Sequence, residues 1–531
     1  MKNILIITLF IGAALGLQSC NDYLDVNTNP NKATKVDPQL LLPAAIVRTA
    51  SLTVGYNTYG GSLGGYIANA GGFSGFGSLL NYNLTPGTHS QWEGAYNNLN
   101  DYKFVLDGAA DEASLTYFKA AANIMSVLEY HRIVDQVGDI PYTEAIQGNS
   151  NISPKYDSAS EVYKALIERL NGAISDIKGA QFALAMTSSS DPLFKGDTDK
   201  WIQFANTLKL RLLIRISGVS SLNSFVQSQF SSLETNFIKD DAIVNPGYAA
   251  DRPNPTWATW GYTTAGAVAT SSRVPTFYVY GYYDGNKLSD AERGRFIFND
   301  FGNTSRPTPL NQLGVEQDNP PIRANYSPWY SGIRNSATSI TNTLGVVKGP
   351  SQGQPIMLLA EAYFLQAEAQ LKGYISGDYK ASFEEGIKAS YRYLYKDVNG
   401  TVVQNTTVNG IAAGNVTTFW TNYKSLNSSS ALVNIELADS DEKRLESIIT
   451  QKFIALNMID GAEAWNDYRR TKYPVSTPRG GKYVDIASTT SNATAADRLP
   501  TIIKYPQSEY DYNAANVKDN DVFVDKLFWA K

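Results

Sequence analysis

The sequence predicts a mainly α-helical fold with long irregular loops that carry short strands, and three observations lead to this prediction. Apolar residues recur at helical spacing over several stretches on either side of the middle of the chain. Between these stretches, residues 245–355 are rich in Pro, Gly, Asn, Tyr and Trp and show little periodicity, which is typical of loops. Hydrophobic residues make up 43% of the 531 residues, enough for a sizeable core.

In the first half of the chain, apolar stripes predict three helices, at residues 115–134, 162–177 and 201–216. The first should break at Gly138-Asp139-Ile140-Pro141, and the second has Ser158 or Ser160 as its N-cap. We expect Trp201 to be a core anchor, because large aromatic side chains at helix ends are usually buried.

In the second half, helices resume at Pro355, with one apolar face over 358–369 and another over 383–391. Two helices with a short connection loosely resemble a tetratricopeptide (TPR) unit. Residues 396–440 are rich in Asn, Thr and Ser and predict a second loop region. A last strong helix is predicted over 442–458, and the tail after Pro474 should be mostly extended and looped.

The N-terminus has the features of a lipoprotein signal. Lys2 precedes an apolar stretch from Ile4 to Leu17, which is too short to span a membrane comfortably. It ends at Leu17-Gln18-Ser19-Cys20, and Cys20 is the only cysteine of the chain. This segment resembles a bacterial lipobox, in which the thiol is lipidated and becomes the first residue of the mature chain. We therefore expect Cys20 to be the lipidation site and residues 1–19 to be the signal peptide.

The remaining chain is interpreted as a tether followed by one domain. Its predicted parts are the tether 20–40, the single domain 41–531, a helical scaffold mainly in 41–235 and 355–470, and a loop-rich ligand-binding excursion over about 245–350. The formal net charge is −5, and the longest basic cluster is Arg469-Arg470-Thr471-Lys472. A nucleic-acid binder normally has a basic balance, so this class is excluded.

Several short motifs occur in a fixed order along the chain. They are Tyr23-Leu24-Asp25, the GDIPY segment Gly138–Tyr142, Pro154–Asp157, Lys200-Trp201 with the FANTLKLR segment Phe204–Arg211, Gln451–Ala455, Glu463–Thr471, Arg498–Pro500 and Tyr505–Tyr510. Together with the lipobox, they resemble the SusD/RagB outer-membrane lipoproteins of the Bacteroidota. The resemblance extends from Cys20 to about Asn516 and thins out in 245–350 and 400–440.

This resemblance implies a SusD-like fold, in which four TPR-like helix pairs form the scaffold and long loops carry the ligand site. It also implies that the protein is anchored in the outer membrane by its lipid, facing the cell exterior. A partner is implied as well, namely a SusC-like TonB-dependent transporter over which the lipoprotein sits as a hinged lid. The family offers no catalytic residue, and we expect neither a cofactor nor a metal.

Three functions therefore remain to be compared. The first is capture of an oligosaccharide (glycan) for the transporter, and the second is a peptide-capturing lid of the RagB kind. The third, a lipid-anchored glycoside hydrolase, would need paired carboxylates such as Glu361 and Glu368. These two residues are seven apart on one helical face, and we interpret them as ordinary polar positions of a helix.

Other candidate sites are weaker. His131 and Asp135 are spaced i, i+4, but a zinc site needs three or four ligands and the chain has only two histidines, His89 and His131. Asp191, Asp197 and Asp199 lack the spacing of an EF-hand and are interpreted as a loop. The Gly-rich stretch from Gly60-Gly61 to Gly77 lacks the ending of a P-loop and suits close helix packing or a flexible loop. In the last motif, Trp465 and Tyr468 should be core anchors, and Glu463 and Arg469 should pair or cap.

The best candidate for the ligand site is the aromatic cluster in the middle loops. Its members are Trp257, Trp260, Tyr282, Tyr283, Tyr326, Trp329 and Tyr330. If they are exposed beside Asn, Asp and Gly, they offer flat apolar platforms with hydrogen-bonding rims, on which sugar rings stack. If they instead pin the loops to the scaffold, the site must lie in 400–440 or in the Gly-rich segment 55–77.

Overall fold

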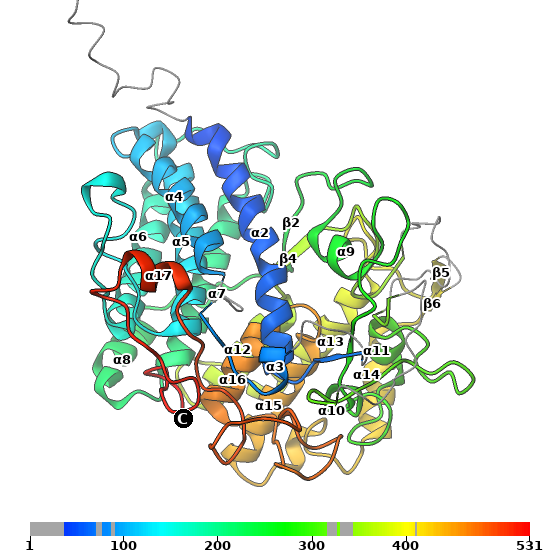
Figure 1. Cartoon of the computed structure of the whole chain (residues 1–531). Coiled ribbons are helices and arrows are strands. Elements are labelled where there is room, and N and C mark those ends of the chain that lie inside the picture. The colour runs from blue at the N-terminus through cyan, green and yellow to red at the C-terminus, as the bar shows by residue number, and fades with distance from the viewer. Residues whose placement is uncertain (1–36, 71–76, 87–90, 316–326, 330–342, 409–410) are drawn as a thin grey trace, which may run out of the picture. The chain divides into compact units, whose positions relative to one another are not determined.

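Helix α2 (Pro38–Leu63) contacts both halves of the helical scaffold and is the blue helix near the centre of Figure 1. The computed structural model describes residues 37–70, 77–86, 91–315, 327–329, 343–408 and 411–531. Residues Pro38–Lys531 form one compact unit. Because α2 begins at Pro38, the first helix starts within the predicted tether 20–40. The predicted signal peptide and Cys20 lie outside the described residues.

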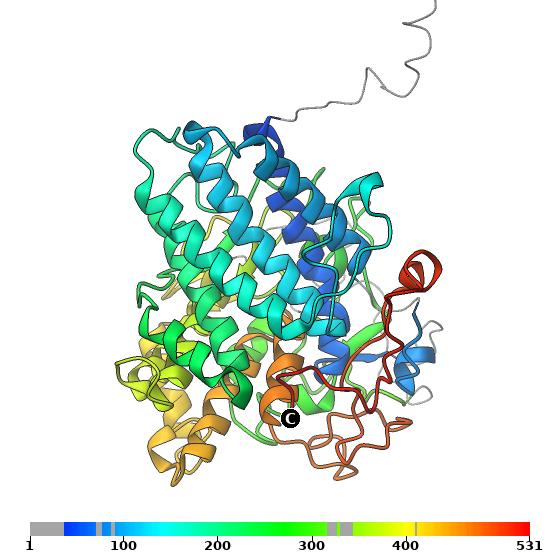
Figure 2. The same cartoon turned by 90° about the vertical axis from the view of Figure 1, so that its left-hand side faces the viewer.

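The helices of the first half pack on one another in the order of the chain. They are α4 (Trp92–Gly108), α5 (Thr116–Val137), α6 (Ala159–Gly179), α7 (Thr198–Ile216) and α8 (Asn223–Ser231), and Figure 2 shows them side by side. The three helices predicted here are confirmed. Gly138 adopts a φ of 92°, which favours glycine, and this ends α5 where the sequence predicts. Ser158 rather than Ser160 caps α6, because its hydroxyl accepts from the Glu161 amide.

The second half repeats this arrangement with α12 (Leu359–Leu371), α13 (Tyr379–Tyr395), α15 (Asp441–Ala455) and α16 (Gly461–Thr471). Helix α12 contacts α7, and α16 contacts α2, so the two halves share one core. The predicted start at Pro355 is wrong by a few residues, because strand β4 (Gln354–Met357) occupies that position. The predicted core anchors Trp201, Trp465 and Tyr468 are all buried.

Residues 396–440 are not simply a loop, in contrast to the prediction. They contain the hairpin β5 (Thr406–Val408) and β6 (Ile411–Ala413), followed by helix α14 (Val416–Leu426). The Asn415 side chain caps α14 by accepting from the amides of Thr417 and Thr418. Trp420 and Tyr423 bury one face of this helix, so packing outweighs the loop-like composition.

Short elements connect the helices, in agreement with the predicted loops and short strands. The helices are α3 (Gly77–Leu80), α9 (Pro255–Trp260), α10 (Phe277–Tyr280), α11 (Ala291–Ile297), α17 (Gln507–Tyr512) and four 3₁₀ turns, Ala113–Leu115, Gly148–Ser150, Ser220–Leu222 and Ile435–Leu437. The other strands are β1 (Ile67–Asn69), β2 (Ala242–Val244) and β3 (Arg273–Pro275). Strand β1 pairs antiparallel with β3, and β2 with β4.

Glycines bring α2 and α16 into direct backbone contact. A Cβ on Gly60 would lie 2.2 Å from the Ala462 nitrogen, and one on Gly461 would lie 2.3 Å from the Gly61 nitrogen. The Gly461 amide donates to Asn57 Oδ1 at 3.0 Å across the same contact. The first part of the Gly-rich stretch therefore serves close helix packing, as the sequence predicts, whereas residues 71–76 lie outside the described part of the chain.

Candidate ligand-binding site

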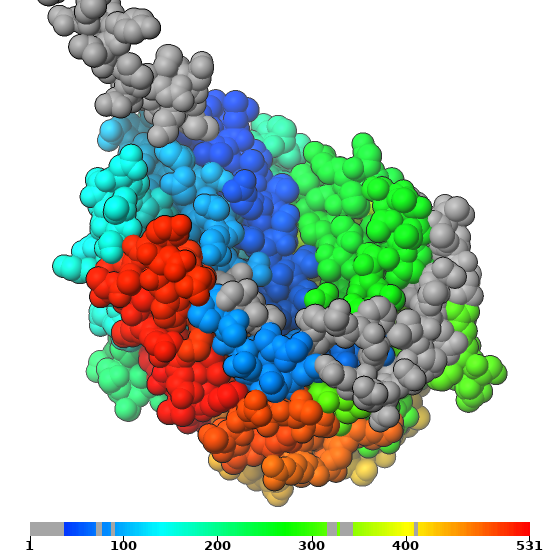
Figure 3. Space-filling model, in the orientation of Figure 1, coloured from blue at the N-terminus to red at the C-terminus, as the bar shows by residue number. Residues whose placement is uncertain are grey.

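A cavity of about 810 Å³ lies between α2 and the segment around α9. In the space-filling view, the blue surface of α2 and the green surface of the α9 segment adjoin (Figure 3). The lining residues are Ser51, Val54, Gly55, Thr58, Tyr59 and Ser62 of α2, Ser78 and Leu79 of α3, Gln91, Pro255, Ala258 and Thr259 of α9, and Ser272 and Arg273 near β3. We call this cavity the α2–α9 pocket.

Helical periodicity explains the α2 wall of the pocket. Ser51, Gly55, Thr58 and Ser62 are spaced three or four residues apart, so they share one face of the helix. The residues are small, and this leaves space between α2 and α9 where larger side chains would fill it. On the opposite wall, Ala258 is exposed at the surface of α9.

The hydroxyl groups of the pocket are arranged mainly as hydrogen-bond acceptors. On α2, Thr58 donates to the Val54 carbonyl at 2.8 Å, and Ser51 and Ser62 donate in the same way to the carbonyl four residues earlier. On α9, Thr259 donates to the Pro255 carbonyl at 2.9 Å. A hydroxyl has one proton and two lone pairs, so each of these groups still has lone pairs that can accept from a ligand.

Two further side chains set the character of the pocket. The Gln91 amide lies over Gly55, where a Cβ would come within 2.4 Å of Gln91 Oε1, so the close approach depends on glycine. Arg273 is the only charged residue among the described lining residues. Its pKa is lowered by burial, because the low-dielectric surroundings disfavour the guanidinium charge. The pocket therefore combines hydroxyl and amide groups with apolar side chains, and Arg273 is its one described charged residue.

The described aromatic residues among those predicted as ligand platforms are not exposed, and for them the prediction of exposed platforms is wrong. Their exposed fractions are 1% for Trp257, 0% for Trp260, 3% for Tyr282, 1% for Tyr283 and 0% for Trp329. Trp257 and Trp260 do belong to α9, but the pocket is lined by other residues of this helix, Pro255, Ala258 and Thr259. Tyr326 and Tyr330 lie outside the described residues.

The buried rings pack against one another and against the scaffold. Trp260 and Trp329 form an edge-to-face pair with ring centroids 6.1 Å apart. The Tyr283 hydroxyl donates to the Ile454 carbonyl of α15, and Tyr282 packs on Phe453. The middle segment thus buries aromatic side chains although its sequence lacks periodicity. Its short helices each place individual rings in the common core.

The two carboxylates considered for glycoside hydrolysis are components of buried ion pairs. Arg211 donates to Glu361 through two bonds of 2.9 and 2.7 Å, and Arg470 binds Glu368 in the same bidentate way. Burial alone would raise the pKa of Glu368, but Arg470 and Lys372 hold it well below its usual range. Both carboxylates are 1% exposed, so they belong to buried ion pairs and are not the ordinary polar positions that the sequence predicts.

A similar network surrounds the only described histidine. His131, Asp135 and Glu463 have ligand atoms within 4.8 Å of one another, but Arg215 binds both carboxylates there. Burial lowers the pKa of His131, which keeps the imidazole neutral. Arg215 already supplies the positive charge that a metal ion would bring. Glu463 therefore forms ion pairs, though not with Arg469, whose guanidinium lies 3.5 Å from the centre of the Trp465 ring.

The aspartates considered for calcium organise a loop, as the sequence predicts. Asp191 accepts from the amides of Leu193, Phe194 and Gly196 and from the indole of Trp201. Asp197 caps α7.

Among the described residues, no helix is both long and apolar enough to be a candidate membrane span.

Comparisons with known proteins identify the class to which this architecture belongs. A family model described as "Starch-binding associating with outer membrane" matches residues 30–265. A second model, described as "Susd and RagB outer membrane lipoprotein", matches residues 312–526. A search of curated proteins finds no match.

Solved structures show the same fold. A SusD homolog from Bacteroides uniformis is 23% identical, with a TM-score of 0.64 over 92% of this chain and 99% of that one. A chitin-binding SusD homolog from Flavobacterium johnsoniae is 22% identical, with a TM-score of 0.65 over 92% and 98%. A chitin-binding protein is 17% identical, with a TM-score of 0.67 over 93% and 100%.

The mainly helical scaffold with a few two-stranded sheets is a SusD-like fold. The chain belongs to the SusD/RagB family of outer-membrane lipoproteins, as its sequence motifs predict. Members of this family are non-catalytic binding proteins of the outer membrane.

Sequence reasoning did not single out the residues of the α2–α9 pocket individually. A signal for them is nevertheless present, because Ser51, Gly55, Thr58 and Ser62 form a row of small residues along one face of α2. Gly55, Thr58, Tyr59 and Ser62 belong to the Gly-rich segment 55–77, one of the two alternative locations expected for the site.

Proposed function

We propose that the α2–α9 pocket binds a neutral oligosaccharide and that the protein passes it to a SusC-like TonB-dependent transporter. The observation that carries this proposal is the row of hydroxyl groups that donate their protons to backbone carbonyls of their own helices. Their lone pairs match the hydroxyl and amide N–H donors of a sugar. Two relatives named for chitin binding and the starch-binding description of one family model support the same class of ligand.

Size and apolar contacts also favour a sugar. Small-molecule pockets usually have volumes of about 300–1,000 Å³, and this cavity of about 810 Å³ lies within that range. Val54, Leu79, Pro255 and Ala258 provide apolar surface between the hydroxyls. The C–H faces of sugar rings fit such a surface. An anionic sugar is less suited, because acceptor groups repel a carboxylate and Arg273 is the only cation among the described lining residues.

The binding test is calorimetric titration of the purified protein with chitin and starch oligosaccharides. Ala258→Trp places a large ring at an exposed position of the pocket wall, and we expect it to weaken binding at least about 30-fold. Ala496→Trp is the matched control, because Ala496 is exposed and does not line the pocket. Equal affinity in both variants would place the ligand elsewhere.

Thr58→Val tests the acceptor argument with little change in shape. Removing one hydroxyl that accepts from the ligand should cost about 1 kcal/mol of binding, or roughly fivefold in affinity. The same titration with short peptides separates the sugar proposal from a RagB-like peptide lid. If peptides bind in the wild type and Ala258→Trp abolishes this binding while no oligosaccharide binds, the ligand is a peptide.

The transporter partnership rests on family membership. Purifying the tagged lipoprotein from its native membranes in mild detergent should recover a TonB-dependent transporter in about equal amount. Recovery of the lipoprotein alone would contradict the proposal. Protease treatment of intact cells should degrade the lipoprotein if it faces the exterior, whereas a protected protein would face the periplasm.

A further inference from the structure

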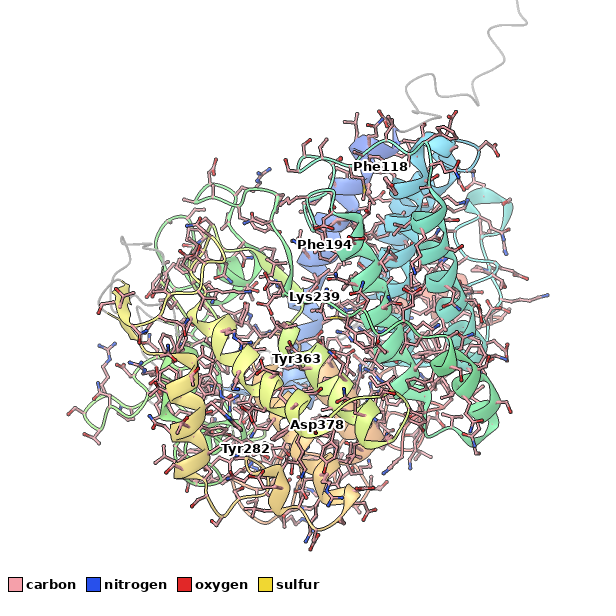
Figure 4. All side chains as sticks on the ribbon, turned by 180° about the vertical axis from the view of Figure 1, so that it is seen from behind. Phe118, Phe194, Lys239, Tyr282, Tyr363 and Asp378 are labelled. Carbon is pink, nitrogen blue, oxygen red and sulfur yellow. The ribbon has the colours of Figure 1, made fainter. Side chains whose placement is uncertain are left out.

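A second cavity of about 450 Å³ lies away from the α2–α9 pocket, where the loop before α7, strand β2 and the turn after α13 meet. Phe194 and Lys239 belong to its lining, and Figure 4 shows both on the face opposite to that of Figure 1. None of its lining residues lines the α2–α9 pocket. We call it the lysine pocket, because Lys195, Lys200, Lys239, Lys348 and Lys396 line it.

The acidic residues of the lysine pocket are already bound within the fold. Lys396 forms ion pairs with both Asp240 and Asp241. Asp397 accepts from the amides of Asn399 and Thr401 and so holds the turn after α13. These three carboxylates are therefore bound within the protein, and they form no ion pair with Lys195, Lys239 or Lys348.

Three of the lysines have no carboxylate partner among the described residues. Lys195 Nζ donates to the carbonyls of Pro192 and Asn245, at 3.2 and 2.7 Å. Lys348 Nζ donates to the carbonyls of Gly345 and Tyr393. Lys239 is exposed and forms no ion pair with a described residue. An ammonium has three N–H donors, so Lys195 keeps one and Lys239 keeps all of its donors. The ammonium of Lys348 also lies 4.5 Å from the centre of the Tyr393 ring.

We propose that the lysine pocket is a second binding site, which takes a small organic anion with a carboxylate, sulfate or phosphate group. The carbonyl oxygens hold the ammonium groups in place without cancelling their charge, and this prepares the site for a charged acceptor. Phe194, Ile238 and Ile243 supply an apolar wall for the uncharged part of the ligand. An acidic sugar has both features.

The environment of Lys348 agrees with this assignment. Burial lowers the pKa of Lys348 to about 7, even though Asp241 and Asp397 act in the opposite direction. Lys396 lowers it further. A bound anion would offset this loss of hydration and stabilise the charged form of Lys348.

The test is calorimetric titration of the protein with D-glucuronate, inorganic phosphate and sulfate, with D-glucose as the neutral match of glucuronate. We expect at least one anion to bind and glucose to leave this pocket empty. Lys239→Gln should weaken the binding of that anion about tenfold, because it removes one cation without breaking any hydrogen bond between described residues. Lys526→Gln is the control, since Lys526 is exposed and lies outside the lining.

The three anions also separate the possible sources of the charged group. Binding of glucuronate alone indicates a carboxylate ligand, and binding of phosphate or sulfate indicates a tetrahedral anion. If no anion binds, or if Lys239→Gln and Lys526→Gln bind it equally well, the proposal is wrong. Ala258→Trp should leave anion binding unchanged, so the lysine pocket is tested independently of the proposed oligosaccharide site.

Discussion

Replacing Trp260 with alanine tests whether the aromatic cluster is structural. Trp260 has an exposed fraction of 0% and packs edge to face on Trp329. A buried aromatic side chain removes about 150–250 Å² from water, which at about 25 cal/mol per Å² corresponds to an upper limit of about 4–6 kcal/mol. Measured truncations of this kind cost about 3–5 kcal/mol, so we expect a loss of that size in the free energy of unfolding.

Urea unfolding followed by circular dichroism measures this loss, and oligosaccharide titration is done on the same samples. Tyr512→Ala is the matched control, because Tyr512 is 80% exposed and its removal should change stability by only about 0.5 kcal/mol. If Trp260→Ala unfolds at the same urea concentration as the control but no longer binds ligand, Trp260 is a ligand residue. That outcome would restore the interpretation of the cluster as a binding platform.

Three further predictions follow from the core and the N-terminus. Gly60→Ala should lower the free energy of unfolding by about 1–3 kcal/mol, because the added Cβ would clash with Ala462. Gly172→Ala is the control, since a Cβ at Gly172 would meet open space. An unchanged free energy of unfolding for Gly60→Ala would contradict the close helix contact. Glu368 has a lowered pKa, so its stabilising contribution is complete above about pH 4.5 and is lost as the pH falls further. The melting temperature of the wild type should therefore drop below that pH, and that of Glu368→Gln should depend less on it. Cys20→Ala should leave the protein without acyl chains and outside the membrane fraction, as measured by mass spectrometry and cell fractionation.

The sequence alone was sufficient for the class of fold and for the longest helices. Helix α6 illustrates why, since its apolar stripe from Val162 to Ile177 repeats at helical spacing and Ser158 caps its start. Such signals are local, because they depend only on neighbouring residues along the chain. Helix α14 was not predicted, because it lies in a segment rich in Thr, Asn and Ser, although Val416, Phe419, Trp420, Tyr423 and Leu426 repeat at helical spacing.

The candidate ligand-binding site depended on contacts that the sequence does not display. Trp257 and Trp260 lie on the helix that borders the pocket, yet both are buried, because α9 packs them into a core built from distant segments. The pocket itself combines α2 with α9, about 200 residues apart in the chain. The small residues of α2 repeat at helical spacing and are a local signal, but only the tertiary structure defines the space between the two walls.

The motifs determined the family and the scaffold, since local periodicity and a fixed order of short segments survive in a linear sequence. Tertiary structure decided which polar residues are free to bind a ligand. Glu361 and Glu368 form ion pairs with Arg211 and Arg470. In contrast, Lys195, Lys239 and Lys348 line a cavity and have no carboxylate partner among the described residues. The physical reason is that burial and charge compensation depend on neighbours in space, and folding brings these together from segments far apart in the chain.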